Sequence, residues 1–450
     1  MQKRYRAFTE GAAAAIHLWW AGAAAVTILV LVALLPVALA IPNLARSDDP
    51  LAVRIGVALG LLAFGLMALQ IVIGSRLRLV SDPLGLGQLL GLHRIIGVLV
   101  LALLVAHPLL VTVGHGKPQL LNPLRAPWGV RVGQAALFLL IIHSILAVFR
   151  TRFSLDYVVW RRIHRGAFLI FALAFVHGFM VGDDLKRLPM QALWVVLLTG
   201  AGLLAFYAHI LKPRALGRNR HRITELIPET HNTTTLVLAP DTGEQFRYLP
   251  GQFMFLTPLD ANFPLEEHPF TISSSPAQKG ILTATIKSVG NFTAHIKNWT
   301  SGGHILVDGP HGKFSYLLHP HADRLAFVAG GVGITPLMSM MRFLRDTRDP
   351  RPIRLIYANQ TEADIIFRDE LEQMQTEMDL RVVHILSRPS ADWRGERGRI
   401  SREFLGRFME KERGAACYVC GPPAMMESAI ADLKALQIPP DRIHSEEFSL

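Results

Sequence analysis

The sequence predicts a multidomain protein: a six-helix transmembrane bundle, then a β-barrel, then an α/β domain. Of its 450 residues, 51% are hydrophobic and 18% are charged, whereas soluble domains carry about 25% charged residues. The first half holds six apolar stretches of membrane-spanning length. The second half changes from short alternating runs, separated by glycine and proline, to strands that alternate with helices.

The net charge of +11 is unevenly distributed along the chain. Residues 1–220 hold 22 Lys and Arg and 7 Asp and Glu, a net +15, and the rest holds 24 basic and 28 acidic residues, a net −4. Because the basic half is also the apolar half, we expect a lipid bilayer and no nucleic acid as its partner. The presence of only two cysteines excludes a disulfide scaffold and a cysteine-ligated zinc or iron–sulfur module.

Six stretches qualify as spans, because a membrane helix needs about 20 mostly apolar residues. They cover about residues 16–42, 53–74, 88–113, 131–149, 164–182 and 191–211. The basic start resembles a signal-peptide n-region, but the apolar run after it is too long and has no clear cleavage site, so we expect a retained first helix. With a cytoplasmic N-terminus, 15 of the 22 basic residues lie inside. This bias predicts a six-span protein of the plasma (inner) membrane whose second half is also cytoplasmic.

Four histidines stand out in the spans, because polar side chains inside a membrane are costly and usually functional. His93 and His107 lie on the third span, 14 residues apart. This separation is about 21 Å of rise and nearly four turns, so the two share a face. His164 and His177 lie on the fifth span, 13 residues apart, which rotates them by about 140° in a straight helix. Tilt, a local distortion or a His164 ring that reaches from the helix end must correct this difference.

Both spans run in the same direction, so the four histidines can meet as one inner and one outer pair. Haem takes axial imidazoles in this arrangement, and we expect His93, His107, His164 and His177 to be its ligands. The alternative for each histidine is an ordinary helix–helix hydrogen bond. His143 on the fourth span competes as a ligand.

The soluble half carries several motifs. Residues 220–320 predict a small barrel that contains His268-Pro-Phe-Thr-Ile-Ser273 and Gly290-Asn-Phe-Thr293. Beyond it, a buried strand leads into Gly330-Gly-Val-Gly-Ile-Thr-Pro336 and a helix. Strand, glycine turn and helix N-terminus form a phosphate cradle, because the backbone N–H groups point at the anion. A plain strand-to-helix turn is the alternative interpretation.

Later strands bring further candidates to the same sheet edge. Ser387 and Arg388 stand at the carboxyl end of a strand, with Arg397 after it. A hydroxyl and a guanidinium there suit a 2′-phosphate, which favours NADPH over NADH; a solvated charge cluster is the alternative. Cys417 is expected in the core of its strand, whereas Cys420 lies at the strand exit, where a nicotinamide ring could pass.

Together these residues resemble the ferric-reductase/NADPH-oxidase superfamily, most of all its compact bacterial members, which are NADPH-oxidase-like transmembrane flavocytochromes b. The resemblance covers nearly the whole chain. It implies a six-span haem-binding domain over 1–215, an FAD-binding β-barrel over 216–320 and a ferredoxin-reductase-like NAD(P)H-binding α/β domain over 321–450. It pairs His93 with His164 at an inner b-type haem, and His107 with His177 at an outer one.

The same resemblance assigns the flavin and nucleotide elements. In the superfamily's flavin motif, Phe270 packs on the isoalloxazine, Thr271 approaches its reactive edge and His268 replaces the usual arginine near the pyrophosphate. A near-terminal aromatic stacks on the flavin where nicotinamide enters. This role makes Phe448 a candidate catalytic residue beside Thr271 and Cys420. The expected cofactor-binding residues are His268, Pro269, Phe270, Thr271, Ile272 and Ser273; Gly290, Asn291, Phe292 and Thr293; Gly330, Gly331, Gly333, Thr335 and Pro336; Ser387, Arg388 and Arg397; and Cys420, Gly421, Pro422 and Phe448.

The resemblance implies an NAD(P)H oxidase that passes electrons from cytoplasmic NADPH, with NADH as the alternative donor, through FAD and two b-type haems to oxygen outside, forming superoxide. A ferric-chelate reductase and an electron-delivery module for an outer-side partner protein are the alternatives. A transporter with a flavoprotein regulator would hold no haem. Because no EF-hand pattern precedes the first span and no long insertion resembles those of regulated animal oxidases, we expect neither calcium control nor an obligatory protein activator.

Overall fold

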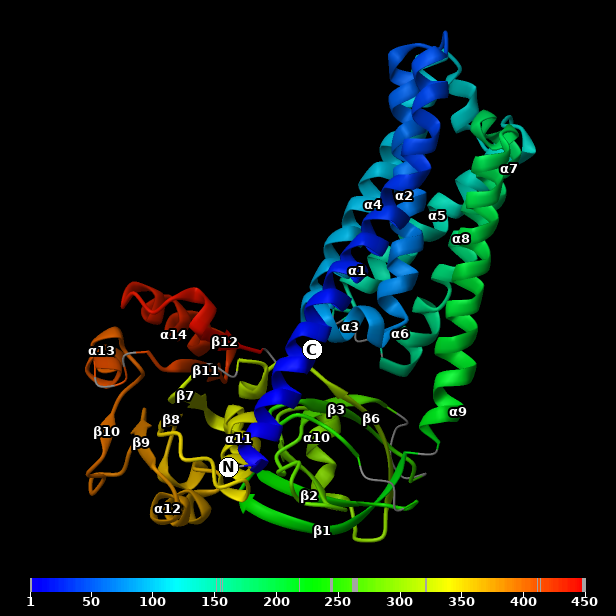
Figure 1. Ribbon diagram of the computed structural model, residues 1–450. Coiled ribbons are helices and arrows are strands. Elements are labelled where there is room, and N and C mark those ends of the chain that lie inside the picture. Colours follow the sequence, from blue (N-terminus) through cyan, green and yellow to red (C-terminus); the bar gives the residue numbers. More distant parts are fainter. Residues whose placement is uncertain are drawn as a thin grey trace. The chain divides into compact units, whose positions relative to one another are not determined.

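The computed structural model describes residues 2–150, 152–153, 155, 157–217, 219–242, 246–260, 266–319, 322–410, 412 and 414–446. It divides into two compact units. One unit is a helical bundle, Trp20–Arg214, drawn from blue to green in Figure 1. The other comprises Ala215–Leu450, together with Met1–Trp19, and holds both β-sheets.

The bundle contains the six expected spans. Its helices are α1 (Gln2–Arg46), α2 (Leu51–Gly74), α3 (Arg78–Leu84), α4 (Leu86–Gly114), α5 (Trp128–Val148), α6 (Tyr157–His164), α7 (Ala167–Val181), α8 (Leu188–Phe206) and α9 (Lys212–Leu216), with the short 3-10 turn η2 (Asp183–Lys186) between α7 and α8. Among the described residues, six segments are long and apolar enough to cross a membrane: Gly22–Arg46, Leu51–Gly74, Leu86–Gly114, Trp128–Val148, Val159–Val181 and Leu188–Leu216. The predicted six-span bundle is therefore confirmed.

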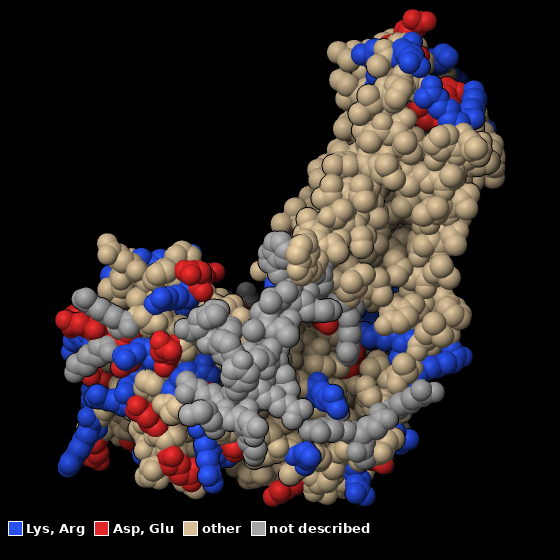
Figure 2. All heavy atoms as spheres, in the orientation of Figure 1, with Lys and Arg blue, Asp and Glu red and all other residues tan. Residues whose placement is uncertain are grey.

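Aromatic stacking fixes the centre of this bundle. Phe64 on α2 stacks on Phe171 of α7 and on Trp194 of α8, with ring centres 4.8 and 4.2 Å apart. Outward-facing apolar side chains such as Ile95 and Val98 are more than half exposed, as expected of a surface that lipid covers. In Figure 2 the visible side of the bundle shows few Lys, Arg, Asp or Glu side chains along its length, and such side chains gather at the end where α1 leads into α2.

The fifth span is interrupted, which answers the spacing problem of its two histidines. His164 is the last residue of α6, and α7 begins only at Ala167. The turn at Arg165 and Gly166 between them changes the helical phase. The expected local distortion is thus present, and His164 stands at a helix end.

The first sheet of the second unit is an antiparallel barrel. Its strands are β1 (Arg220–Thr230), β2 (Thr233–Pro240), β3 (Phe253–Pro258), β4 (His268–Thr271), β5 (Leu282–Lys287) and β6 (His304–His311), in the order β4-β3-β6-β1-β2-β5. Ile272, directly after β4, bridges Ala284 of β5 and so curls the sheet on itself. Its core includes the fully buried Leu236, Met254 and Val307. The one-turn helix α10 (Asn291–Ala294) follows β5.

The second sheet is parallel throughout, with the order β10-β9-β8-β7-β11-β12. Its elements are β7 (Leu325–Gly330), α11 (Ile334–Asp346), β8 (Ile353–Asn359), α12 (Arg368–Glu377), β9 (Leu380–Leu386), β10 (Glu396–Arg397), α13 (Arg402–Glu410), β11 (Ala416–Cys420), α14 (Pro423–Ala435) and β12 (Ile443–Ser445). The strand order reverses between β7 and β11, and ligands of such sheets bind at the carboxyl ends of strands beside this reversal. The predicted multidomain fold class is confirmed.

Candidate functional site

The histidine pair His107 and His177 lies between α4 and α7. The ring centres of His107 and His177 are 6.2 Å apart, with an interplanar angle of 79°. The Nδ1–H of His107 donates to the carbonyl of Gly56 at 2.8 Å, and that of His177 donates to the carbonyl of Gly129, also at 2.8 Å. A carbonyl is only an acceptor, so both rings carry their proton on Nδ1 and keep Nε2 as a lone-pair ligand.

The pair His93 and His164 has a similar separation but different surroundings. The ring centres of His93 and His164 are 5.9 Å apart, and the Nδ1 atoms of both are buried without a hydrogen bond among the described residues. His143 of α5 also stacks on His164, 4.8 Å away at 25°, and Trp160 stacks on it at 4.9 Å. The structure thus brings the expected histidines together in the expected pairs.

These residues fit a haem better than a bare metal ion. Among the described residues no group of three His, Cys, Asp or Glu side chains is arranged so that it could hold a metal ion, whereas a protein-held ion needs three or four such ligands. A porphyrin supplies four nitrogens itself, so two axial imidazoles complete the coordination of its iron. Two imidazoles that bind one metal through bonds of about 2.0–2.1 Å place their ring centres about 6 Å apart. The observed separations, 5.9 and 6.2 Å, agree with this value.

The two expected flavin elements meet on the barrel. The His268 ring of β4 stacks on Phe292 of α10, with centres 3.9 Å apart, and Phe270 lies 6.3 Å from the same ring. The Nε2–H of His268 donates to the carboxylate of Glu266 at 2.9 Å. Pro269 and Phe270 remain half-buried. This face therefore presents aromatic and imidazole rings that a flat ring system could pack against.

The next residues of the first flavin element form part of the barrel framework. Ile272 and Ser273 are fully buried. The Ser273 hydroxyl bonds the hydroxyls of Thr283 and Thr285 at 2.8 and 3.0 Å. Their backbones are also engaged: Ile272 N donates to the Gln252 carbonyl and Ser273 N to that of Thr283. These two residues hold Thr271 in place.

The second flavin element is a turn fixed by its own threonine. The Thr293 hydroxyl accepts the backbone N–H groups of Val289 and Gly290, each at 2.9 Å. Gly290 precedes α10, and the backbone of Asn291 begins that helix. The side chain of Asn291 lies outside the described residues. The turn thus stands beside the stacked His268 and Phe292 rings.

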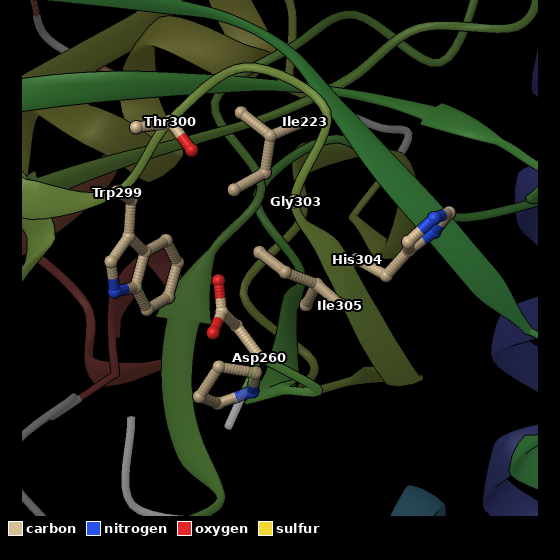
Figure 3. A pocket seen from close by; sticks show the side chains of 8 residues that line it. Ile223, Asp260, Trp299, Thr300, Gly303, His304 and Ile305 are labelled. Atoms are coloured by element: carbon tan, nitrogen blue, oxygen red, sulfur yellow. The ribbon is translucent and has the colours of Figure 1, made fainter. Parts of the chain in front are cut away.

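A small pocket opens elsewhere on the barrel (Figure 3). Trp299 and Ile305 line it, with His304 at its rim and the Asp260 carboxylate pointing into it. Trp299 packs edge-on against Phe292, with ring centres 6.0 Å apart. No expected FAD residue lines this pocket, and Trp299 connects its wall to Phe292.

The two expected nucleotide elements touch at the strand-order reversal. A Cβ at Gly333 would lie 2.4 Å from the carbonyl oxygen of Cys420, and one at Gly330 would lie 2.9 Å from Pro422. Gly421 in turn faces the backbone of Gly330. Glycines are therefore required here for the close approach of β7 and β11, not only for ligand access.

The remaining residues of the glycine turn lie just before α11 and in its first turn. Gly331 has a φ of +52° and open space where a Cβ would point. Thr335 and Pro336 are buried in the first turn of α11, and the Thr335 hydroxyl donates to the Val332 carbonyl at 3.0 Å. The N–H groups at this helix start remain suited to a diphosphate.

The residues expected to bind a 2′-phosphate differ in the contacts that their side chains make. Ser387 and Arg388 are exposed directly after β9. Among the described residues, the Arg388 side chain makes no ion pair. Arg397 instead donates from Nη2 to the carbonyls of Ser390, Ala391 and Trp393, at 3.2, 2.9 and 2.8 Å. Arg388 is thus available to a phosphate, whereas Arg397 organises the loop beside it.

Two of the three expected catalytic residues, Thr271 and Cys420, are connected through Phe253, Gly312 and Glu446. Thr271 pairs with Phe253 across β4 and β3. Phe253 lies beside Gly312. A Cβ added at Gly312 would also lie 2.8 Å from the Glu446 carboxylate. Burial raises the pKa of the Cys420 thiol, and the neighbouring Glu446 raises it further. Cys417 is buried in the core of β11, as expected. Phe448 lies outside the described residues.

Three family models match the chain in this order: the ferric reductase like transmembrane component over residues 59–175, an FAD-binding domain over 229–315 and the oxidoreductase NAD-binding domain over 327–430. This order of domains is that of the resemblance stated from the sequence. The chain belongs to the ferric-reductase/NADPH-oxidase superfamily.

Individual relatives of this superfamily member cover only part of it. It is 30% identical over 241 residues to the glycine betaine monooxygenase reductase subunit of Chromohalobacter salexigens, across 52% of this chain and 64% of the relative. It is 30% identical over 237 residues to NADH-cytochrome b5 reductase 1 of Candida glabrata, across 50% of this chain and 83% of the relative. The chain thus spans slightly less than two thirds of the betaine monooxygenase reductase subunits, at 64 to 65%.

Among solved structures, the FAD/NAD-binding domain of nitric oxide dioxygenase from Vibrio cholerae O1 biovar El Tor shares 21% identity with this superfamily member. Its TM-score is 0.46, over 51% of this chain and 98% of that chain. By its domains the chain is an oxidoreductase that joins a membrane-type bundle to FAD- and nucleotide-binding domains.

Sequence reasoning missed two residues at the site of this superfamily member. Glu446 is half-buried, its carboxylate accepts the N–H of Phe314 at 3.2 Å, and desolvation raises its pKa to about 7. Arg342 of α11 donates to the Ser273 carbonyl at 2.7 Å. Acidic residues near a chain end and arginines in a helix are usually solvated, so neither position carried a signal. The adjacency of Glu446 to the expected catalytic Phe448 was the only hint available.

Proposed function

We propose that the chain is a transmembrane NAD(P)H oxidase. It passes electrons from cytoplasmic NADPH through FAD and two b-type haems to oxygen on the outer side of the plasma membrane, forming superoxide. Bound FAD would accept the hydride of the nicotinamide, and the haem irons would carry electrons singly. The observation that carries this proposal is the presence of two facing histidine pairs, His93/His164 and His107/His177, in a chain with FAD- and NAD-binding domains.

The chain's own residues supply binding and order. The N–H groups at the start of α11 suit the diphosphate of the nucleotide, and Arg388 suits a 2′-phosphate. Residues Thr271 and Cys420 border the buried region where nicotinamide and flavin would meet. The pairs His93/His164 and His107/His177 would each hold one haem, which would supply one-electron transfer toward the acceptor.

The proposed topology rests on charge. With the N-terminus and the dehydrogenase domains in the cytoplasm, 15 of the 22 basic residues of 1–220 face inward, in line with the positive-inside bias of membrane proteins. The last turn of α6 contains Arg161 and Arg162, and Arg165 follows directly after this helix. The His93/His164 pair, close to these arginines in sequence, would then be the inner one.

A reduced-minus-oxidised absorption spectrum of the purified protein tests the haem proposal. We expect a b-type spectrum with two haems per chain, and the loss of one haem in His107→Ala. A wild-type protein without haem would contradict the whole assignment of the bundle and would favour a transporter with a flavoprotein regulator.

The electron acceptor needs a separate assay. NADPH-driven cytochrome c reduction, measured with and without oxygen and ferric citrate, should depend on oxygen and be suppressed by superoxide dismutase. Reduction that persists without oxygen when ferric citrate is present would instead favour ferric-chelate reduction. Reduction that needs an added outer-side protein would favour an electron-delivery module.

A further inference from the structure

The membrane domain contains the same histidine support twice. Gly56 and Gly60 stand four residues apart on α2, and Gly129 and Gly133 stand four residues apart on α5. The α2 glycines face His107 of α4, and the α5 glycines lie next to the His177 ring of α7. The helix pairs α2 with α4 and α5 with α7 thus each contain two glycines, four residues apart on one helix, beside a histidine of the other helix.

The first glycine of each pair is a hydrogen-bond acceptor. Gly56 lies 51 residues before its histidine and Gly129 lies 48 residues before its own, yet both Nδ1···O distances are 2.8 Å. In a helix the carbonyl of residue i also accepts the N–H of residue i+4, which here is the second glycine. The imidazole therefore uses the second lone pair of the carbonyl oxygen.

The second glycine of each pair makes room for the ring. A Cβ at Gly60 would lie 2.8 Å from Nδ1 of His107, and a Cβ at Gly133 would lie 2.6 Å from Nδ1 of His177. Real Cβ contacts are essentially never shorter than 3.0 Å. The imidazole ring cannot move away from such a Cβ without breaking its hydrogen bond to the first glycine. The hydrogen bond therefore requires that the second residue has no side chain.

We propose that these two Gly-x-x-x-Gly segments are positioning residues for the outer haem ligands. Each fixes the Nδ1–H form of its histidine and the place of the ring, so that the two Nε2 atoms are presented to one iron. This inference rests on the proposed haem function. It goes beyond that function by naming the residues that set ligand orientation on both sides of the outer site.

The repeat continues toward the inner pair and assigns a role to His143. Ten residues after Gly60 stands Gln70, and ten residues after Gly133 stands His143. The Gln70 amide donates to the His93 carbonyl at 2.8 Å, and the His143 ring stacks on His164 at 4.8 Å. Gln70 of α2 therefore supports His93 of α4, and His143 of α5 supports His164 at the end of α6, directly before α7. By this correspondence His143 is a support and not an axial ligand.

The test uses single substitutions in the full-length protein in detergent. Gly60→Ala and Gly133→Ala should lower bound haem from two to one per chain, or convert one of two low-spin ferric signals in the electron paramagnetic resonance spectrum to high spin. Gly74→Ala on α2 and Gly200→Ala on α8 are matched controls, because a Cβ at either position meets nothing within 4 Å. Both controls should keep two low-spin haems.

His143→Gln, which places in α5 the residue that α2 has at the corresponding position, should also keep two low-spin haems. Loss of one haem in this variant would show that His143 is a ligand. Two unchanged low-spin haems in both Gly60→Ala and Gly133→Ala would overturn the positioning role. Loss of both haems in either variant would show a general packing role and would also overturn it. A wild-type chain without haem would instead refute the proposed function.

Discussion

Arg342 of α11 donates a hydrogen bond from Nη1 to the backbone carbonyl of Ser273, 2.7 Å away and two residues beyond Thr271. The same guanidinium bonds Glu370 through Nε at 2.9 Å and lies 4.8 Å from the centre of the Phe367 ring. Helix α11 thus begins at the glycine turn of the nucleotide-binding domain. Two turns later, its Arg342 binds the barrel at Ser273, just after β4.

Replacing Arg342 should therefore weaken the contact between the FAD-binding barrel and the nucleotide-binding domain. Arg342→Met leaves the Ser273 carbonyl without its arginine partner and the Glu370 carboxylate with Arg345 alone, 3.4 Å away. The arginine that is lost is only 13% exposed. We expect a loss of about 2 kcal/mol in stability and slower reduction of FAD by NADPH. The temperature of FAD release and stopped-flow flavin reduction would measure the two effects.

Arg368→Met provides the control for that variant, because its ion pair with Glu372 is exposed on both sides. Exposed pairs of this kind contribute about 0.5 kcal/mol or less. If Arg342→Met and Arg368→Met released FAD at the same temperature, the contact of Arg342 with the barrel would contribute no more to stability than an exposed ion pair.

Gly333→Ala should separate the two nucleotide elements. Its Cβ would lie 2.4 Å from the Cys420 carbonyl oxygen, which is backbone and cannot rotate away. The glycine turn and the end of β11 must then move apart, and we expect the KM for NADPH to rise about 10-fold or more, equivalent to about 1.4 kcal/mol. Bound FAD should stay unchanged. Gly406→Ala on α13, whose Cβ meets only Leu436 at 3.4 Å, should leave both unaltered.

Local patterns made much of this fold predictable. The run Thr233–Pro240 alternates and forms β2 with those bounds, and the glycine turn does lead from β7 into α11. Helix rise and the parallel direction of the two spans predicted that the four histidines meet as two pairs, and the family resemblance assigned His93 to His164, whose ring centre lies 5.9 Å away. These features depend on spacing along one or two segments, which a sequence displays directly.

Features that depend on distant contacts escaped prediction. Gly56 and Gly129 look like ordinary small membrane residues until helix packing puts His107 and His177 on their carbonyls. Glu446 becomes special only because the loop at Phe314 encloses it. Burial and hydrogen bonding across long sequence separations create such sites, and neither is visible in composition or periodicity.

Arg388 and Arg397 should differ in what they do for the nucleotide. Arg388 is exposed at the end of β9, so Arg388→Ala should lower kcat/KM for NADPH about 10- to 100-fold, the value of a charge-assisted hydrogen bond, and leave NADH oxidation unchanged. Arg397 bonds three backbone carbonyls, so Arg397→Ala should impair both nucleotides. Parallel steady-state kinetics with the two donors would decide. Equal losses for both donors in Arg388→Ala would rule out its contact with a 2′-phosphate.

Glu446 should make the stability of the dehydrogenase domains depend on pH. Burial raises its pKa from 4.5 to about 7. Between these values the folded chain holds a proton that the unfolded chain has released, so stability falls as pH rises from about 4.5 to about 7 and then levels off. A shift of this size corresponds to a loss of about 3 kcal/mol. The temperature of FAD release should accordingly be lower near pH 8 than near pH 5.

Glu446→Gln isolates this effect, because the amide keeps the shape of the carboxyl group and never ionises. Other titrating groups, such as His444 with its pKa lowered by burial to about 4, contribute equally to both proteins and cancel in the difference between them. We expect the variant to match the wild type near pH 5 and to hold FAD to a higher temperature near pH 8. Glu427→Gln on the exposed face of α14 should show no such divergence. Parallel pH curves for the wild type and Glu446→Gln would mean that Glu446 is ionised in the folded protein throughout this range.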